Sequence, residues 1–159
     1  MCSSGDAGSV SPGAQPGFAQ LNTQPYRQES DALGAVDVPL SAYWGVHTAR
    51  ALANFPLSGR AVRPELVRAM ALVKLACCHA NGELGYLPQP EAQAIADACR
   101  EVAEGGLADY FVVDALQGGA GTSTNMNMNE VLANRAEELL GGSLGSYARI
   151  APLRHVNLH

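Results

Sequence analysis

The chain has 159 residues, 47% of them hydrophobic, with a formal net charge of −5 and a pI near 5.2. This composition suits one globular domain with an apolar core. The negative charge and the lack of lysine or arginine runs argue against nucleic-acid or anionic-membrane partners, and no apolar stretch is long enough to cross a bilayer.

Residues 1–25 differ in composition from the rest of the chain. They are rich in Gly, Ser, Pro and Gln, and Asp6 is their one charged residue. They lack the basic start and the apolar block of a secretory signal. We therefore expect a disordered extension over residues 1–25, followed by a single domain over residues 26–159.

The segment from Tyr26 to Leu52 predicts short extended pieces and turns. Val36 and Val38 alternate with Asp37, and Pro39 stops the strand. A short β segment near residues 26–38 is expected from this pattern.

Three helices are predicted beyond residue 60. The first begins at Pro64 and fades by Gly82 to Gly85, and its apolar stripe consists of Leu66, Met70, Val73 and Cys77, widened by Val67 and Leu75. The second begins near Pro90, ends at Gly105–Gly106, and carries on one face Ala92, Ile95, Cys99 and Val102. The third runs from about Thr124 to Leu140, is closed by Gly141–Gly142, and has as apolar residues Val131, Leu132, Ala136 and Leu139. The folded part is thus predicted to be mainly α.

The cysteines are predicted to be packed thiols rather than disulfides or metal ligands. Cys77 and Cys78 are adjacent in a helical pattern, and His79 follows. Consecutive helical side chains point about 100° apart, so these three cannot converge on one ion, and we expect no metal site. Free thiols, including Cys2 and Cys99, suit a cytoplasmic location.

The stretch QGGAGTSTNMNMNE, Gln117 to Glu130, combines a glycine loop with the start of the third helix. The first N–H groups of a helix lack internal partners and carry the positive end of the dipole, so glycines there let an anion approach. No lysine follows the glycines, which argues against the usual phosphate loop. The simpler alternative is that Thr122, Ser123 or Thr124 only caps the helix.

The asparagines in this stretch favour more than a cap. Asn125 and Asn129 are four residues apart and share a helix face, whereas Asn127 points elsewhere. Amides that offer donors and acceptors indicate a buried, fully paired network behind a polar site.

Four segments in order resemble the N-terminal domain of the aspartase/fumarase superfamily: LGAVDVPLSAYWGVHTARALANFPLSG, VRPELVRAMALVKLACCHAN, GGAGTSTNMNMNEVLANRAEELLGG and PLRHVN. The resemblance covers residues 26–159. It implies a mainly α fold, truncated before the central helical bundle that assembles the family's homotetramer.

Within the superfamily, the motifs are closer to the aspartase branch. Ala120 and Ser123 stand where fumarases have serine and glutamine, and AYWGVHT and NFPLSG are also aspartase-like. Residues 151–154 replace the His-Pro-Asn-Asp of a secondary fumarase site. A class II fumarase is the alternative, and a non-catalytic helical interaction module is a third hypothesis.

The resemblance implies elimination of ammonia from L-aspartate to give fumarate, without metal or organic cofactor. Thr122 matches the family's substrate-binding threonine, Ser123 lies beside it in the substrate site, and Asn125 supports the loop. The catalytic serine loop and a further Ser-Thr-Asn-Asp motif are expected beyond His159, so no catalytic base is expected in this chain. His155, like His47 and His79, is expected to be structural.

Overall fold

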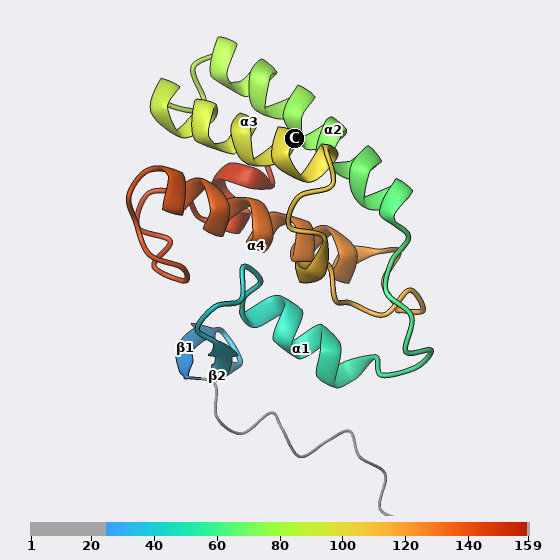
Figure 1. The fold of residues 1–159 in the computed structure, drawn as a ribbon. Helices are drawn as coiled ribbons and strands as arrows, with labels where there is room; N and C mark the ends of the chain where they lie inside the picture. Colours follow the sequence, from blue (N-terminus) through green and yellow to red (C-terminus); the bar gives the residue numbers. More distant parts are fainter. Residues whose placement is uncertain (1–24, 159) are drawn as a thin grey trace, which may run out of the picture.

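The computed structural model describes residues 25–158, so the predicted extension at residues 1–25 lies, except for Pro25, outside the described residues. The elements in order are β1 (Tyr26–Asp31), β2 (Gly34–Pro39), α1 (Val46–Asn54), α2 (Pro64–Glu83), α3 (Gln89–Ala103), a 3-10 turn (Ala108–Tyr110), α4 (Thr122–Leu139) and a π-helical turn (Pro152–Val156). Figure 1 shows α4 between the α2–α3 pair and a layer of α1 with the hairpin. The predicted mainly α fold with a short β segment is confirmed.

The two strands form an antiparallel hairpin. Arg27 pairs with Val38, and the turn residue Gly34 has a φ of +114°, a backbone conformation that favours glycine. Val38 is fully buried, and Asp37 beside it is exposed. The alternation that predicted the strand thus separates an inner from an outer face.

Helix α1 was not predicted, because the sequence up to Leu52 indicated only extended pieces and turns. Its N-cap, Gly45, has no side chain that can cap the helix. Instead the carboxylate of Glu130 accepts hydrogen bonds from the backbone N–H groups of Gly45, His47 and Thr48 at 2.8–3.0 Å. The cap comes from α4, so no local pattern indicates it.

The predicted bounds of α2 are confirmed, but its predicted apolar face is only partly right: Val67 is buried and Met70 packs against the core, whereas two other members are exposed. Leu66 and Val73 are 50% and 62% exposed. The buried row lies one position further along the helix and consists of Val67, Ala71, Lys74 and Cys78. Both rows have helical spacing, and the small Ala71 lets α3 approach closely on the buried side.

The predicted face of α3 is confirmed, since all four of its apolar residues are buried. The helix ends where the glycines were expected to end it. Gly105 has a φ of +96°, and the N–H of Gly106 returns to the carbonyl oxygen of Glu101 at 2.9 Å.

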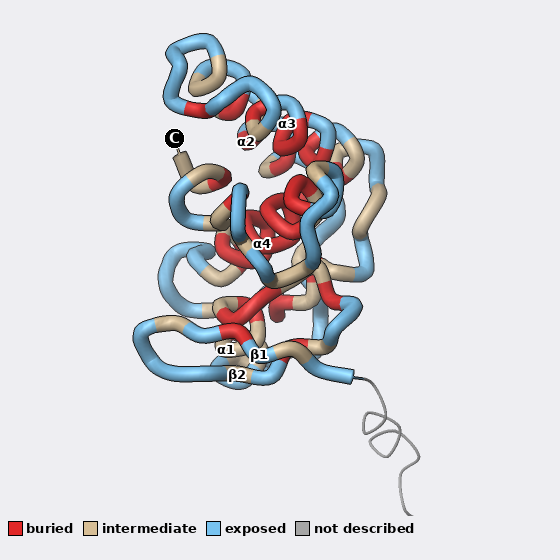
Figure 2. Tube along the Cα trace, turned by 90° about the vertical axis from the view of Figure 1, so that its left-hand side faces the viewer, coloured by how far each residue is buried: buried red, intermediate tan, exposed pale blue. Residues whose placement is uncertain are grey.

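Helix α4 is the centre of the fold, and Figure 2 shows it as the most continuous buried segment. Its start differs by two residues from the predicted one, and Leu139 is 44% exposed rather than buried. Val131, Leu132 and Ala136 are fully buried as predicted. No helix within residues 25–158 is both long and apolar enough to span a membrane.

Five polar side chains of α4 are also almost fully buried, with exposed fractions of 0–1%: Asn127, Asn129, Glu130, Asn134 and Glu137. Each one forms hydrogen bonds to residues outside α4. Asn134, for example, donates to the carbonyl oxygen of Tyr43 at 2.7 Å and accepts from the N–H of Gly145 at 2.7 Å. The predicted burial of the amides is confirmed for Asn127 and Asn129, but the network is not fully paired as predicted, because the buried Asn129 Oδ1 atom has no hydrogen-bond partner among the described residues. The buried polar side chains hold the loops around the central helix.

Candidate substrate site

The glycine loop before α4 has an unusual backbone conformation. Gly119, Ala120 and Gly121 follow one another with φ values of +78°, +54° and +84°. Alanine is disfavoured in this region, so Ala120 is held there by its surroundings. The three residues turn the chain directly into the first turn of α4.

The cap of α4 comes from Gln117, not from a hydroxyl side chain as the simpler alternative supposed. The Gln117 Oε1 atom accepts from the backbone N–H of Thr124 at 2.9 Å. The Gln117 Nε2 group donates to Thr124 Oγ1 and to the carbonyl oxygen of Asp114, each at 2.8 Å. No side chain caps at Gly121 itself, so Thr122 and Ser123 are not needed as caps.

The carboxylate of Asp114 holds the segment that leads into the glycine loop. It accepts from the backbone N–H and the hydroxyl of Ser58, both at 2.6 Å, and from the N–H groups of Gly59 and Leu116 at 2.8 and 2.7 Å. These hydrogen bonds, with the one from the Ser58 side chain foremost, hold the pKa of Asp114 well below its usual range. Sequence reasoning missed Asp114 and Gln117, because their partners are set by the fold.

Thr122 and Ser123 lie at the exposed start of α4, Thr122 exposed and Ser123 partly buried. The Thr122 hydroxyl donates to the carbonyl oxygen of Gly119 at 2.6 Å. Within residues 25–158, neither the N–H nor the hydroxyl of Ser123 makes a hydrogen bond. The first turn therefore presents an unpaired N–H and two hydroxyls at the positive end of an 18-residue helix, an arrangement that can accept a carboxylate.

Asn125 and Asn129 converge on one acceptor, as their shared face predicted. Their Nδ2 groups donate to Asn157 Oδ1 at 3.0 and 2.9 Å. Asn127 points to the other side, accepting from the N–H of Val112 and donating to the carbonyl oxygen of Tyr110. Asn125 thus joins the start of α4 to the segment after the π-helical turn.

The candidate histidines do not meet the loop. His155 Nδ1 accepts from the backbone N–H of Ala151 at 2.9 Å, which closes the π-helical turn. His79 lies beside Arg100, with 3.3 Å between His79 Nε2 and an Arg100 guanidinium nitrogen. The structural role of His155 stays a prediction, and this hydrogen bond is consistent with it.

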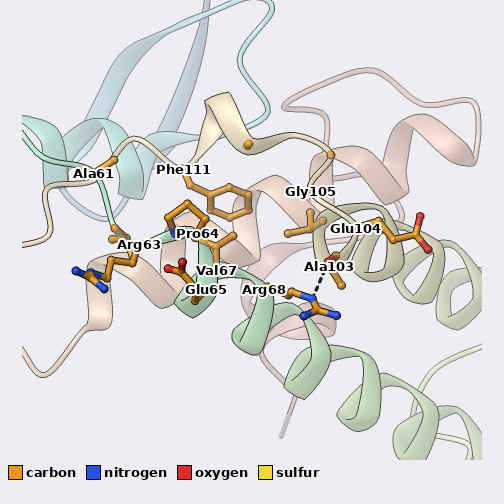
Figure 3. Close-up of a pocket in the computed structure, with 14 residues that line it drawn as sticks. Ala61, Arg63, Pro64, Glu65, Val67, Arg68, Ala103, Glu104, Gly105 and Phe111 are labelled. Carbon is orange, nitrogen blue, oxygen red and sulfur yellow. Dashed lines mark hydrogen bonds between the residues drawn. The ribbon is translucent and has the colours of Figure 1, made fainter.

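A pocket of about 790 Å³ lies away from the loop, between the start of α2, the end of α3 and the turn that follows α3 (Figure 3). Val67, Val102 and Phe111 line its apolar part. At its edge the Nε of Arg68 donates to the carbonyl oxygen of Ala103 at 3.2 Å. None of residues 117–125 lines this pocket, so it is separate from the candidate substrate site.

Comparison with known proteins connects this arrangement to one enzyme family. The family described as Lyase matches residues 34–159. An aspartate ammonia-lyase from Bacillus sp. is 49% identical over 138 residues, which are 87% of this chain and 29% of that protein. A class II fumarate hydratase from Nitrosomonas europaea is 50% identical over 132 residues, 83% of this chain and 29% of that protein.

A solved structure has the same fold. The crystal structure of a fumarate lyase:delta crystallin from Brucella melitensis in native form superposes with a TM-score of 0.83 at 51% identity. The match covers 84% of this chain and 32% of that one. The chain therefore spans less than a third of the length of these relatives.

Proposed function

Because the chain belongs to this lyase family, we propose that it provides the substrate-binding start of α4 in an aspartate ammonia-lyase. The reaction converts L-aspartate to fumarate and ammonia. The observation that carries the proposal is the first turn of α4, where the Ser123 N–H and the hydroxyls of Thr122 and Ser123 are grouped beside a glycine loop.

The chemistry places a specific demand on this turn. A base removes a proton from Cβ of aspartate, the electrons of that C–H bond form the double bond, and the C–N bond breaks to release ammonia. Negative charge builds on the β-carboxylate before the C–N bond breaks. Fixed donors at a helix start stabilise that charge without having to reorganise.

Each residue has a defined part in the proposal. Thr122 and Ser123 bind the β-carboxylate, and Asn125 supports the turn through Asn157. The Thr122 hydroxyl donates to Gly119 in the absence of substrate. On binding, it turns from that carbonyl oxygen to the substrate, whose charged oxygen is the stronger acceptor.

The aspartase branch is preferred over a class II fumarase on the form of the loop. The stretch GGAGTS has Ala120 and Ser123 where fumarases carry serine and glutamine. The identities to an aspartate ammonia-lyase and to a class II fumarate hydratase, 49% and 50%, do not discriminate between the two. A fumarase is therefore the alternative, and substrate choice is measured directly in the experiment below.

The experiment uses a chimera in which this chain replaces the matching segment of the Bacillus sp. aspartate ammonia-lyase. Fumarate is followed by its ultraviolet absorbance with L-aspartate or L-malate as substrate, and the 159-residue chain alone is expected to be inactive. In the chimera, Thr122→Ala is expected to lower kcat/KM for aspartate about 100-fold, the scale of losing one donor to a developing oxyanion.

Two neighbouring variants serve as controls. Ser123→Ala keeps the backbone N–H and is expected to cost about tenfold, on the scale of a single hydrogen bond to a charged group. Thr124→Ala removes only the Gln117 contact and is expected to act on stability. Turnover of malate instead of aspartate would favour the fumarase, and equal, mild losses in all three variants would contradict the proposed site.

The same proposal includes the family's assembly and location. We propose a cytoplasmic location, which the free thiols of Cys77, Cys78 and Cys99 support. We also propose a homotetramer, which membership of the lyase family supports. Light scattering on the active chimera measures the mass, and an active monomer would contradict this part.

A further inference from the structure

We propose that Lys74 is a positioning residue for this site: its ammonium group sets the orientation of the Asn157 amide, and through that amide the position of Asn125 beside Thr122. The inference rests on the lyase function proposed above. It gives a role to Lys74, a buried residue of α2 that lies outside the glycine-loop motif.

Lys74 is buried in the middle of α2, with an exposed fraction of 5%. Burying a lysine is costly, and burial indeed lowers the pKa of its amino group. Its Nζ atom lies 3.4 Å from Asn157 Oδ1. A helix interior that only needed packing would hold an apolar side chain here, as it does at Val67, Ala71 and Cys78.

The Asn157 oxygen is the meeting point of three donors. The amide groups of Asn125 and Asn129 in α4 donate to it at 3.0 and 2.9 Å, and Lys74 reaches it from α2. A carbonyl oxygen has two lone pairs, and the two asparagine amides already use them. Lys74, as the third donor, therefore acts on this oxygen mainly through its positive charge. The positive charge of Lys74 keeps the oxygen, rather than the NH₂ group, of the planar Asn157 amide at this junction.

The same segment is held to α2 a second time. The Nδ2 group of Asn81 donates to the carbonyl oxygen of Leu158 at 2.7 Å. Lys74 and Asn81 are seven residues apart, two turns along one face of the helix. Residues 157 and 158 are therefore held between α2 and α4, next to the first two turns of α4.

The link to the substrate site is Asn125. Its amide lies one turn after Thr122 in α4, and Asn125 and Lys74 together are the polar residues that line a pocket of about 280 Å³. If the Asn157 amide turns over, its NH₂ group faces the NH₂ groups of Asn125 and Asn129, and like dipoles push the two asparagines away. A shift of that kind reaches the first turn of α4 directly.

The first test uses the side-chain amide signals of Asn125 and Asn129 in NMR spectra of the 159-residue chain. Lys74→Met keeps the length of the side chain and removes the charge and the donors. We expect it to shift both signals and to leave the backbone signals of α3 in place. Leu72→Met on the exposed face of the same helix is the matched control, and it should shift neither.

The second test measures kcat and KM separately in the chimera described above. Lys74→Met and Asn157→Ala should each lower kcat about tenfold with KM changed less than threefold, and the double variant should lose no more than either single variant, because both break one junction. A role in packing alone predicts a lower melting temperature with unchanged kcat per folded molecule. That result, or losses that multiply, would overturn the proposal.

The two tests separate this inference from the proposed function. If the parent chimera turns over neither aspartate nor malate, the proposed function fails, and the amide signals alone decide whether Lys74 positions the asparagines. Unchanged Asn125 and Asn129 signals in Lys74→Met would overturn the positioning role whatever the chimera does.

Discussion

The carboxylate of Glu130 in α4 accepts a hydrogen bond from the backbone N–H of Gly45 at 2.9 Å, across 85 residues of sequence. The Oε2 atom of Glu29 accepts from the N–H of Val46, the next residue, at 3.0 Å. A Cβ atom on Gly45 would lie 3.1 Å from Glu130 Oε1, and it would overlap with Glu29. The start of α1 is thus built around two buried carboxylates, and only glycine fits between them.

Removing the Glu130 carboxylate should therefore unfold α1 first. Glu130→Ala leaves three backbone N–H groups at the helix start without an acceptor, and we expect it to lower the free energy of unfolding by about 3 kcal/mol or more. Urea titration followed by circular dichroism measures the loss. Glu83→Ala, an exposed carboxylate at the end of α2, is the control and should stay within about 0.5 kcal/mol of the parent.

The glycine loop predicts an asymmetry between two neighbouring substitutions. Gly121→Ala places a side chain at a φ of +84° and should cost about 1–2 kcal/mol of stability. Ala120→Gly relieves backbone strain at a φ of +54° but raises the conformational entropy of the unfolded chain. These effects oppose each other, so the free energy of unfolding should change by less than about 1 kcal/mol in either direction. The urea midpoints of both variants test this, and a large loss in Ala120→Gly would show that the alanine methyl group makes contacts of its own.

The stability of the hairpin layer should depend on pH through Asp31. Two hydrogen bonds from the Arg50 guanidinium, both at 2.7 Å, lower the pKa of Asp31 from 3.8 to about 2. The folded state thus favours the carboxylate, so this contribution is present above pH about 4 and is lost as the pH falls toward 2. Asp31→Asn should flatten the fall in the urea midpoint across that window.

Glu29 in the same hairpin contributes a pH dependence of stability with the opposite sign to that of Asp31, so the Asp31 effect is judged against a control carboxylate. Burial raises the pKa of Glu29, so its contribution is lost as the pH rises through that pKa. Asp37→Asn, at an exposed position of β2, removes a carboxylate without an arginine partner. If Asp37→Asn flattens the profile as much as Asp31→Asn does, the ion pair is not the cause.

The cysteines should differ in reactivity. Burial raises the pKa of the Cys99 thiol to about 12 and also raises that of Cys78, so thiolate is scarce and inaccessible at both positions. In a Cys2→Ser background, an aromatic disulfide reagent at pH 8 should modify one thiol quickly, the partly buried Cys77. The other two should react only in urea, and three fast thiols in the folded protein would contradict this packing.

The sequence by itself determined the helices whose signals are local. Pro64 and the glycines at 105–106 and 141–142 mark helix ends through their own backbone preferences, and the helical spacing of α3 identified its buried face. The sharing of one face by Asn125 and Asn129 also followed from spacing alone. The family resemblance, carried by ordered motifs, predicted the fold that the comparison structures share.

Tertiary structure decided what depends on partners far along the chain. Two rows of α2 have equal periodicity, and only the positions of α3 and α4 determine that Val67 and Lys74 are covered while Leu66 and Val73 stay exposed. Helix α1 depends on a carboxylate of α4, and α4 on the amide of Gln117. A hydrogen bond between residues far apart in the chain has no sequence signature, because its donor and its acceptor can each bond to water instead. Only folding brings the two groups together.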